Sequence, residues 1–218
     1  MRRLSPQPPA DSPVWGGHKP GQGAIYVPSC PYKPLAAAVG VDAAADLTAP
    51  FWAARQPAAA AVDPVMLARR AVSRMRLSGP DIQSPQPGRT YVVGMPMWMH
   101  VGTSPTTYGP NSASATAGAV TVTATAQVTG VEWAMGDGKT VVCTGPGTAY
   151  RSAFGKQSSP DCGHLYTRTS AAQPSHTFPV TATATWRIDW QGAGQQGHFT
   201  QTRSSQVRVS VGEVQALG

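Results

Sequence analysis

The stretch Ala119–Gly138, AVTVTATAQVTGVEWAMGDG, decides the fold class of this chain. In its first half, valine and alanine alternate with threonine and glutamine without a break. A period of two predicts a β-strand with one buried face and one face in water, and β-branched residues suit such a half-buried surface. Gly130 allows a bend, and Val131–Met135 then resumes the extended pattern. Gly136-Asp137-Gly138 predicts a tight turn at the end.

Phe178–Gln191 alternates in the same way and predicts a second long strand. Gly192–Gly197 is expected to be a flexible hairpin loop, after which His198–Arg203 and Gln206–Val214 complete the sheet. Nearer the N-terminus, Thr90–Gly94 and Met97–Val101 predict short strands, whereas Thr103–Ala117 is expected to be a loop. About seven strands at this spacing predict a mainly β chain with an antiparallel β-sandwich over residues 89–214.

Residues 63–79 predict the one clear helix of the chain. Asp63 is suited to the N-cap and Pro64 to the first helical position. An apolar stripe follows at helical spacing, and Gly79-Pro80 ends the pattern. Four arginines crowd its second half, Arg69, Arg70, Arg74 and Arg76. Cations there also stabilise the helix dipole, so the alternatives are an ordinary solvated end and a face that binds an anion or a partner.

Residues 1–62 are rich in proline, glycine and alanine and carry little apolar bulk. Such a segment offsets the entropy of ordering poorly, so we expect a loosely ordered region with one short strand at Ala24–Val27. The start Met1-Arg2-Arg3-Leu4 is typical of a secretory signal, but Ser5–Pro9 stands where its apolar core should follow. The chain as written is therefore expected to carry no export signal.

The chain has 17 Lys and Arg against 10 Asp and Glu, a net charge of +7. This charge indicates either a solvated basic surface or attraction to an anionic polymer, such as a cell-wall polyanion, lipid head groups or nucleic acid. Outside the helix the basic residues are scattered, so nucleic acid is not expected. No run approaches the roughly 18 apolar residues of a membrane span.

Three cysteines are present, Cys30, Cys143 and Cys162, without the spacing of a zinc or redox motif. Cys143 follows an expected strand, and Cys162 lies in a loop that returns to another strand. We expect a disulfide between these two, which would indicate an oxidising compartment. Cys30 is then left without a partner.

The stretch Trp133–Gly138 resembles the W-x-F-G-D-G signature of PKD (polycystic kidney disease) repeats, with Met135 at the aromatic position. His164-Leu165-Tyr166 resembles the H-x-Y motif of that family, although His176-Thr177-Phe178 also fits it. The resemblance implies an Ig/PKD-like antiparallel β-sandwich of a secreted or surface protein. Its structural motif residues here are Trp133, Gly136, Asp137, Gly138, His164 and Tyr166. It further implies that the tryptophan is core and that the aspartate braces a turn.

Val93–Met99 and Ser104–Pro110 also resemble a group of uncharacterised secreted proteins of actinomycetes, often labelled ATP/GTP-binding. That resemblance implies an export signal upstream of Met1. The residues of this sequence give little support to nucleotide binding. Gly138-Lys139-Thr140 has the ending of a P-loop, but Trp133 stands at the position of the first glycine, and a strand is expected where a helix should begin.

Catalytic and metal motifs are weak in this sequence. The acidic residues are scattered, no G-x-S-x-G or H-E-x-x-H occurs, and the five histidines lack ligand spacing. Trp186 and Trp190 share a strand face with valine and alanine, so core burial is expected ahead of a carbohydrate platform.

We expect no cofactor and no metal, and a non-enzymatic exported binding or structural module at the cell envelope. Its expected partner is an envelope protein or an anionic cell-wall polymer. The alternatives are an accessory subunit that docks through the arginine-bearing helix, and an enzyme or nucleotide-binding protein with an unrecognised site.

Overall fold

The structure, a computed structural model, describes residues 1–27, 49–56 and 62–213. The chain divides into two compact units, Met1–Ala61 and Val62–Gly218. Strands dominate the described residues, as the sequence predicts, and they form several separate sheets. Within the described ranges, no helix is both long enough and apolar enough to span a membrane.

The first unit contains a small antiparallel sheet of β1 (Arg2–Arg3), β2 (Ala24–Val27) and β3 (Phe51–Ala53), with β2 in the middle. The strand β2 has the predicted bounds, but its two partners were not expected from the composition. Buried Trp15, in the 3-10 helix η1 (Pro13–Trp15), and buried Ile25 supply a small apolar core. Cys30 and most of the alanine-rich stretch lie outside the described residues.

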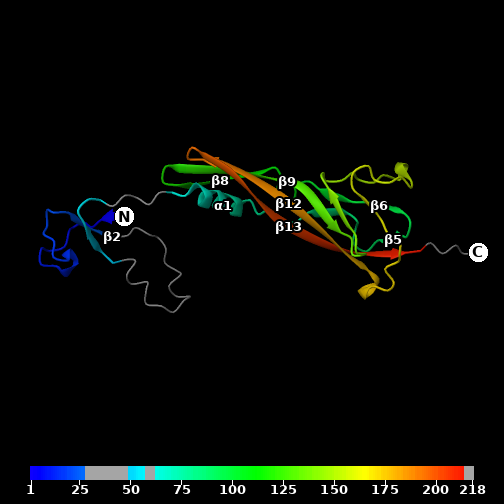
Figure 1. The fold of residues 1–218 in the computed structure, drawn as a ribbon, viewed down its shortest axis with the longest axis horizontal. Coiled ribbons are helices and arrows are strands. Elements are labelled where there is room, and N and C mark those ends of the chain that lie inside the picture. The colour runs from blue at the N-terminus through cyan, green and yellow to red at the C-terminus, as the bar shows by residue number, and fades with distance from the viewer. Residues whose placement is uncertain (28–48, 57–61, 214–218) are drawn as a thin grey trace, which may run out of the picture. The chain divides into compact units, whose positions relative to one another are not determined.

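The second unit is built on a six-stranded sheet (Figure 1). Its centre is three long strands, β9 (Val120–Ala134), β12 (Phe178–Gly192) and β13 (Gln195–Gly212), all antiparallel. On the far side of β9, β8 (Asn111–Ala117) pairs with one half of the strand and β10 (Thr140–Cys143) with the other half. On the far side of β13, β5 (Thr90–Val92) pairs in parallel with residues 210–212.

The predicted alternation of β9 and β12 is confirmed. Val122, Ala124 and Ala126 are buried, whereas the threonines between them are exposed. A bulge follows: Thr185 lies opposite Gly130 and Trp186 opposite Val128, so that one residue of β9 is unpaired. The predicted bend at Gly130 therefore coincides with a bulge, which switches the buried side of β9 from even-numbered to odd-numbered residues.

Two connections differ from the prediction. The second half of the expected loop Thr103–Ala117 is strand β8, whose hydroxyls pair with those of β9, for example Ser114 Oγ with Thr123 Oγ1 at 2.8 Å. Its serine and alanine residues have too little apolar bulk to reveal the alternation. The expected six-residue loop at Gly192–Gly197 is a two-residue turn, Ala193-Gly194, with φ of 52° and 70°.

One face of the main sheet is covered by two different structures. At one end lie two strand pairs: β6 (Pro96–Trp98) with β11 (Gly163–Leu165), and β7 (His100–Gly102) with β4 (Asp81–Ser84). The predicted single strand Met97–Val101 is thus split between β6 and β7. At the other end, by the β12–β13 turn, lies helix α1 (Pro64–Arg74) (Figure 1). All three share one hydrophobic core with β9 and β12.

Helix α1 begins as predicted, because Asp63 accepts a hydrogen bond from the backbone N–H of Val65 at 2.9 Å. It ends at Arg74 and does not continue to residue 79. The reason lies in the next residues: Arg76 has a φ of 54°, and the side-chain amide of Asn111 donates to the carbonyl of Met75 at 3.0 Å. A side chain from β8 therefore satisfies a terminal helix carbonyl.

Replacing Trp133 by alanine tests the role of this core. The indole is 1% exposed, so its loss leaves a large cavity, and we expect a decrease of about 3–5 kcal/mol in the free energy of unfolding. The measurement is equilibrium unfolding in urea. The matched control is Val142→Ala on the exposed side of β10, for which a change within about 0.5 kcal/mol is expected. Equal effects of the two substitutions would contradict the assignment of Trp133 to the core.

Candidate functional site

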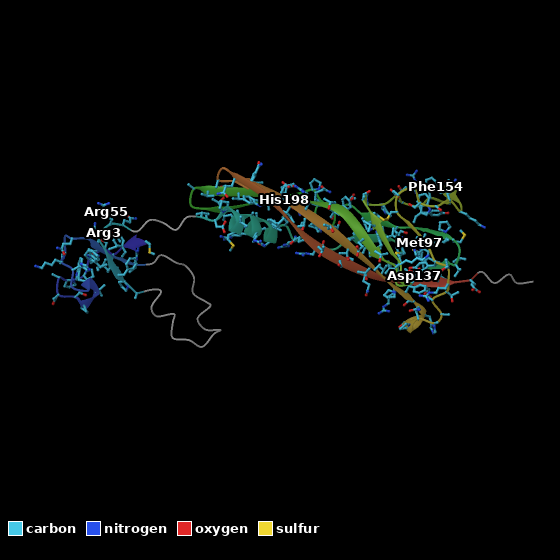
Figure 2. The ribbon with its side chains drawn as sticks, in the orientation of Figure 1. Arg3, Arg55, Met97, Asp137, Phe154 and His198 are labelled. Atoms are coloured by element: carbon cyan, nitrogen blue, oxygen red, sulfur yellow. A yellow bond between two sulfur atoms is a disulfide. The ribbon has the colours of Figure 1, made fainter. Side chains whose placement is uncertain are left out.

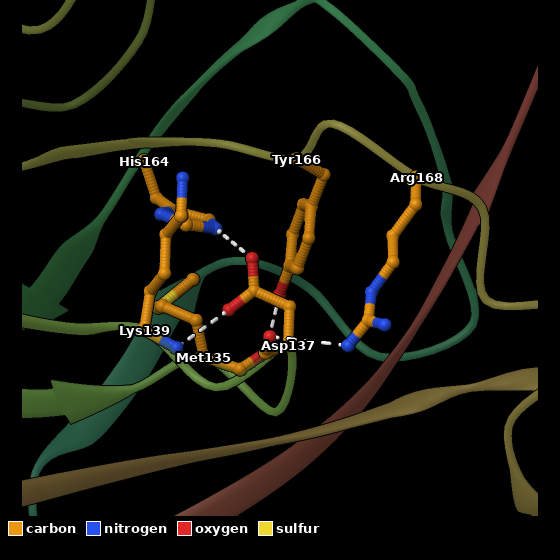
Figure 3. A network of polar contacts seen from close by, with 6 residues as sticks. All are labelled: Met135, Asp137, Lys139, His164, Tyr166 and Arg168. Atoms are coloured by element: carbon orange, nitrogen blue, oxygen red, sulfur yellow. Dashed lines mark hydrogen bonds and ion pairs between the residues drawn. The ribbon is translucent and has the colours of Figure 1, made fainter.

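A network of polar contacts surrounds the Gly-Asp-Gly turn between β9 and β10 (Figure 3). Asp137 Oδ2 lies 2.9 Å from His164 Nε2, and both side chains are only 4% exposed. Asp137 Oδ1 accepts a hydrogen bond from the backbone N–H of Lys139 at 3.0 Å. The guanidinium of Arg168 donates to the backbone carbonyl of Asp137 at 3.1 Å. Strand β11 and the segment after it are thus tied to the turn through one aspartate.

Tyr166 completes this network. Its hydroxyl donates to the carbonyl of Met135 at 2.8 Å, and its ring stacks on Phe178 with centroids 4.9 Å apart. Burial, and then the negative charge of Asp137, raise the pKa of Tyr166 well above its usual range. The phenol is therefore a neutral hydrogen-bond donor at physiological pH. Trp133 is buried in the core, and Asp137 holds its turn through the hydrogen bond to Lys139.

The Cys143–Cys162 disulfide is present, as predicted, with its Cα atoms 5.5 Å apart. It joins the end of β10 to the start of β11. Within the enclosed loop, Asp161 accepts hydrogen bonds from the backbone N–H of Thr148 at 3.1 Å and from its hydroxyl at 2.8 Å. The loop is therefore held at both ends, covalently and by hydrogen bonds.

Three other sequence candidates can be placed. Lys139 leads into strand β10, as predicted, and not into the helix that a P-loop needs. Trp186 and Trp190 are buried in the core, as expected, and Trp190 packs so closely on Gly197 that a Cβ there would lie 2.8 Å from its ring. No group of three or more histidine, cysteine or acidic residues suited to a metal ion occurs among the residues that the structure describes.

The four arginines of the predicted interaction face lie in different surroundings. Arg74 donates from Nη1 to the carbonyl of Ser114 on β8 at 3.0 Å, which is a structural contact. Arg70 is exposed on the helix. Arg69 lies over the ring of Phe199 on β13, at 5.4 Å from the centroid, and Arg76 lies beyond the helix end on the same side.

Arg69 and Arg76 border a cavity of about 300 Å³ between α1 and β13. We call it the basic groove and define it by six residues: Arg69, Ser73, Arg76, Phe199, Gln201 and Arg203. Arg203 is fixed by a hydrogen bond from Nε to the carbonyl of Leu77 at 3.1 Å. No acidic side chain lines the groove, and the buried Nε2 of Gln201 has no hydrogen-bond partner in the described part of the chain.

Sequence reasoning found the helix half of this groove and missed the β13 half. Phe199, Gln201 and Arg203 alternate along β13, so the pattern could have placed them on one face of a strand. It could not have placed that face beside α1, because the pairing of β13 with β12 and the packing of the helix are long-range properties of the fold.

The comparisons with known proteins find no relative of this chain. No protein-family model matches the chain, no curated protein matches it, and no solved structure matches it.

Removal of the disulfide is expected to destabilise the second unit. In the chain-entropy model, closure of a loop of this length contributes roughly 3 kcal/mol, so the double variant Cys143→Ser, Cys162→Ser should lose about that amount. Urea unfolding of the variant and of the wild type, with and without a reducing agent, measures it. The reducing agent should lower the midpoint of the wild type alone. An equal response of the variant would contradict the assigned pairing.

The Asp161 carboxyl makes the loop sensitive to acid. Burial acts to raise its pKa, but hydrogen bonds from Thr148 and Ser159 outweigh this effect, so the pKa lies below its ordinary value. A lowered pKa in the folded state stabilises above the unfolded value of about 4, and this stabilisation disappears as the pH falls through the folded pKa. Asp161→Asn should therefore unfold at lower urea than the wild type at neutral pH.

The two unfolding curves should approach each other as the pH falls through the folded pKa of Asp161, because the wild-type carboxyl is then also protonated. A difference in midpoint that is the same at neutral and acidic pH would show that the carboxylate charge is not responsible.

Proposed function

We propose that this chain is a non-enzymatic exported module that binds an anionic polymer of the cell envelope through the basic groove. The observation that carries the proposal is the gathering of Arg69, Arg76 and Arg203 around one cavity whose lining includes no acidic side chain. Planar guanidinium groups match carboxylate and phosphate oxygens with paired hydrogen bonds. Anionic wall polymers repeat such groups along their length.

The groove is partly organised before any ligand binds. The ring of Phe199 holds the guanidinium of Arg69, and the Leu77 carbonyl holds that of Arg203. Arg203 also donates to the carbonyl of Thr202 at 2.9 Å and to Oε1 of Gln201 at 3.4 Å, so two of its five N–H donors remain for a ligand. A fixed set of donors loses less side-chain entropy on binding.

The fold and the disulfide support export. A covalent link between Cys143 and Cys162 is favoured in oxidising compartments. We further propose that the second unit is a PKD-like β-sandwich, which the burial of Trp133 and the hydrogen bond of Asp137 within its turn support. Such a sandwich is an expected scaffold for a surface module.

One observation favours a second candidate, an accessory subunit that docks on a protein through α1. Met66 is 62% exposed on this helix, beside the exposed Val65. Helix docking commonly uses apolar side chains of this kind as anchors. Substitution of Met66 by serine separates the two candidates, because it removes an apolar anchor and leaves the basic groove intact.

The proposed function is tested by titrating the oxidised full chain with three soluble polyanions: polyphosphate, polygalacturonate and lipoteichoic acid. The groove variant carries Arg69→Ser, Arg76→Ser and Arg203→Ser. The matched control removes the same charge at exposed cations outside the groove, with Arg70→Ser, Lys156→Ser and Arg208→Ser. We expect the wild type to bind at least one polymer and to bind it more weakly as salt is added.

The groove variant should lose about tenfold or more in affinity, because a hydrogen bond to a charged group contributes roughly 1.5–3 kcal/mol. The control variant should retain most of the wild-type affinity. Absence of binding to all three polymers, or an equal loss in the two variants, would refute a specific groove. A partner protein that is captured by the wild type and lost with Met66→Ser would support the second candidate.

A further inference from the structure

A larger cavity, of about 600 Å³, lies at the other end of the second unit from α1, beside strands β4 to β7. Figure 2 shows Phe154 and Met97 at this end, away from the β12–β13 turn. We call the cavity the aromatic groove and define it by six of its lining residues: Gln86, Arg89, Tyr91, Trp98, His100 and Tyr150. Binding pockets for small ligands typically have volumes of roughly 300–1,000 Å³.

The aromatic rings of this groove are held in fixed positions. Trp98 stacks on Phe154 with centroids 4.8 Å apart, and Tyr150 meets Trp98 edge to face at 5.7 Å. The hydroxyl of Tyr150 donates to the carbonyl of Gly155 at 3.0 Å, and that of Tyr91 accepts from the backbone N–H of Gln86 at 2.8 Å. Although anchored in this way, Tyr150 leaves 48% of its surface exposed. The groove therefore presents a rigid apolar wall to solvent.

Three polar side chains line the groove beside these rings and make no polar contact that stabilises the fold. The amide of Gln86, the guanidinium of Arg89 and the imidazole of His100 make no hydrogen bond or ion pair with any other residue that the structure describes. Together they offer both donors and acceptors. Side chains of this kind that converge on one apolar pocket are typical of a ligand site.

We propose that the aromatic groove binds a saccharide. A pyranose ring has an apolar C–H face and a rim of hydroxyl groups, so it matches an exposed aromatic ring flanked by side chains that both donate and accept. The rings of Tyr150 and Tyr91 would pack on the C–H face, and Gln86, Arg89 and His100 would bind the hydroxyl groups. This site is separate from the basic groove and does not depend on the function proposed for it.

A proline-rich peptide is the competing ligand for an aromatic-lined groove, and the geometry favours the saccharide. Tryptophan in peptide grooves of this kind commonly offers its indole N–H to a peptide carbonyl. Here Trp98 donates that N–H to the carbonyl of Gln157 at 2.8 Å, and its side chain is almost fully buried. The groups that remain accessible are the tyrosine rings and the three polar side chains.

The experiment is a screen of the oxidised full chain on a glycan microarray, with a proline-rich peptide array in parallel, followed by titration calorimetry with the saccharides that bind. The variants are Tyr150→Ala, which removes an exposed ring, and Arg89→Ala, which removes a side chain without described partners. The matched control is Leu165→Ala, an exposed apolar side chain outside the groove. Thermal unfolding checks that each variant is folded.

We expect binding to at least one saccharide, with a loss of about tenfold or more in each groove variant and none in the control. The basic-groove variant should bind the same saccharide as the wild type does, which separates this test from that of the polyanion site. Three outcomes would overturn the proposal: no saccharide bound, binding restricted to the peptide array, or binding unchanged in Arg89→Ala and in a folded Tyr150→Ala.

Discussion

The apolar face of β12 is the constraint on which the second unit depends. Every even-numbered residue from Phe178 to Trp190 is buried, along a strand of 15 residues that is roughly 50 Å long. The face is covered in two parts, by helix α1 at one end and by two short strand pairs at the other. Both candidate sites lie at the rims of these covers, where the structure leaves a cavity.

The features of this fold that are local in sequence could be predicted. Strict alternation identified β9 and β12, glycines marked the turn at Asp137, and Asp63 with Pro64 marked the start of α1. Strand β8 was missed because serine, alanine and threonine alternate in polarity too weakly. Neither groove could be predicted as a whole, because each unites residues from distant segments whose proximity depends on sheet register and on the packing of the covering layer.

The residues of the recognisable sequence motif are not the residues whose side chains are available to bind a ligand. Asp137, His164 and Tyr166 direct their polar atoms to one another or to nearby backbone, and so maintain the connection between β9, β10 and β11. Arg89 and His100 belong to no motif, yet they have no described partner. In this chain the residues of the sequence motif stabilise the fold. The side chains that are available to bind a ligand lie outside the motif.

The long strand β13 has a consequence for how the molecules behave at high concentration. On its outer side β13 pairs with β5 over residues 210–212 alone, so much of its backbone forms the border of the sheet within the described residues. Gly79 packs on the backbone of Ser204 and covers part of this border, whereas uncovered sheet borders invite pairing between molecules. Arg203 and Arg208 place positive charge along this border, and two copies brought together there would repel each other. The arginine that lines the basic groove thus also opposes aggregation.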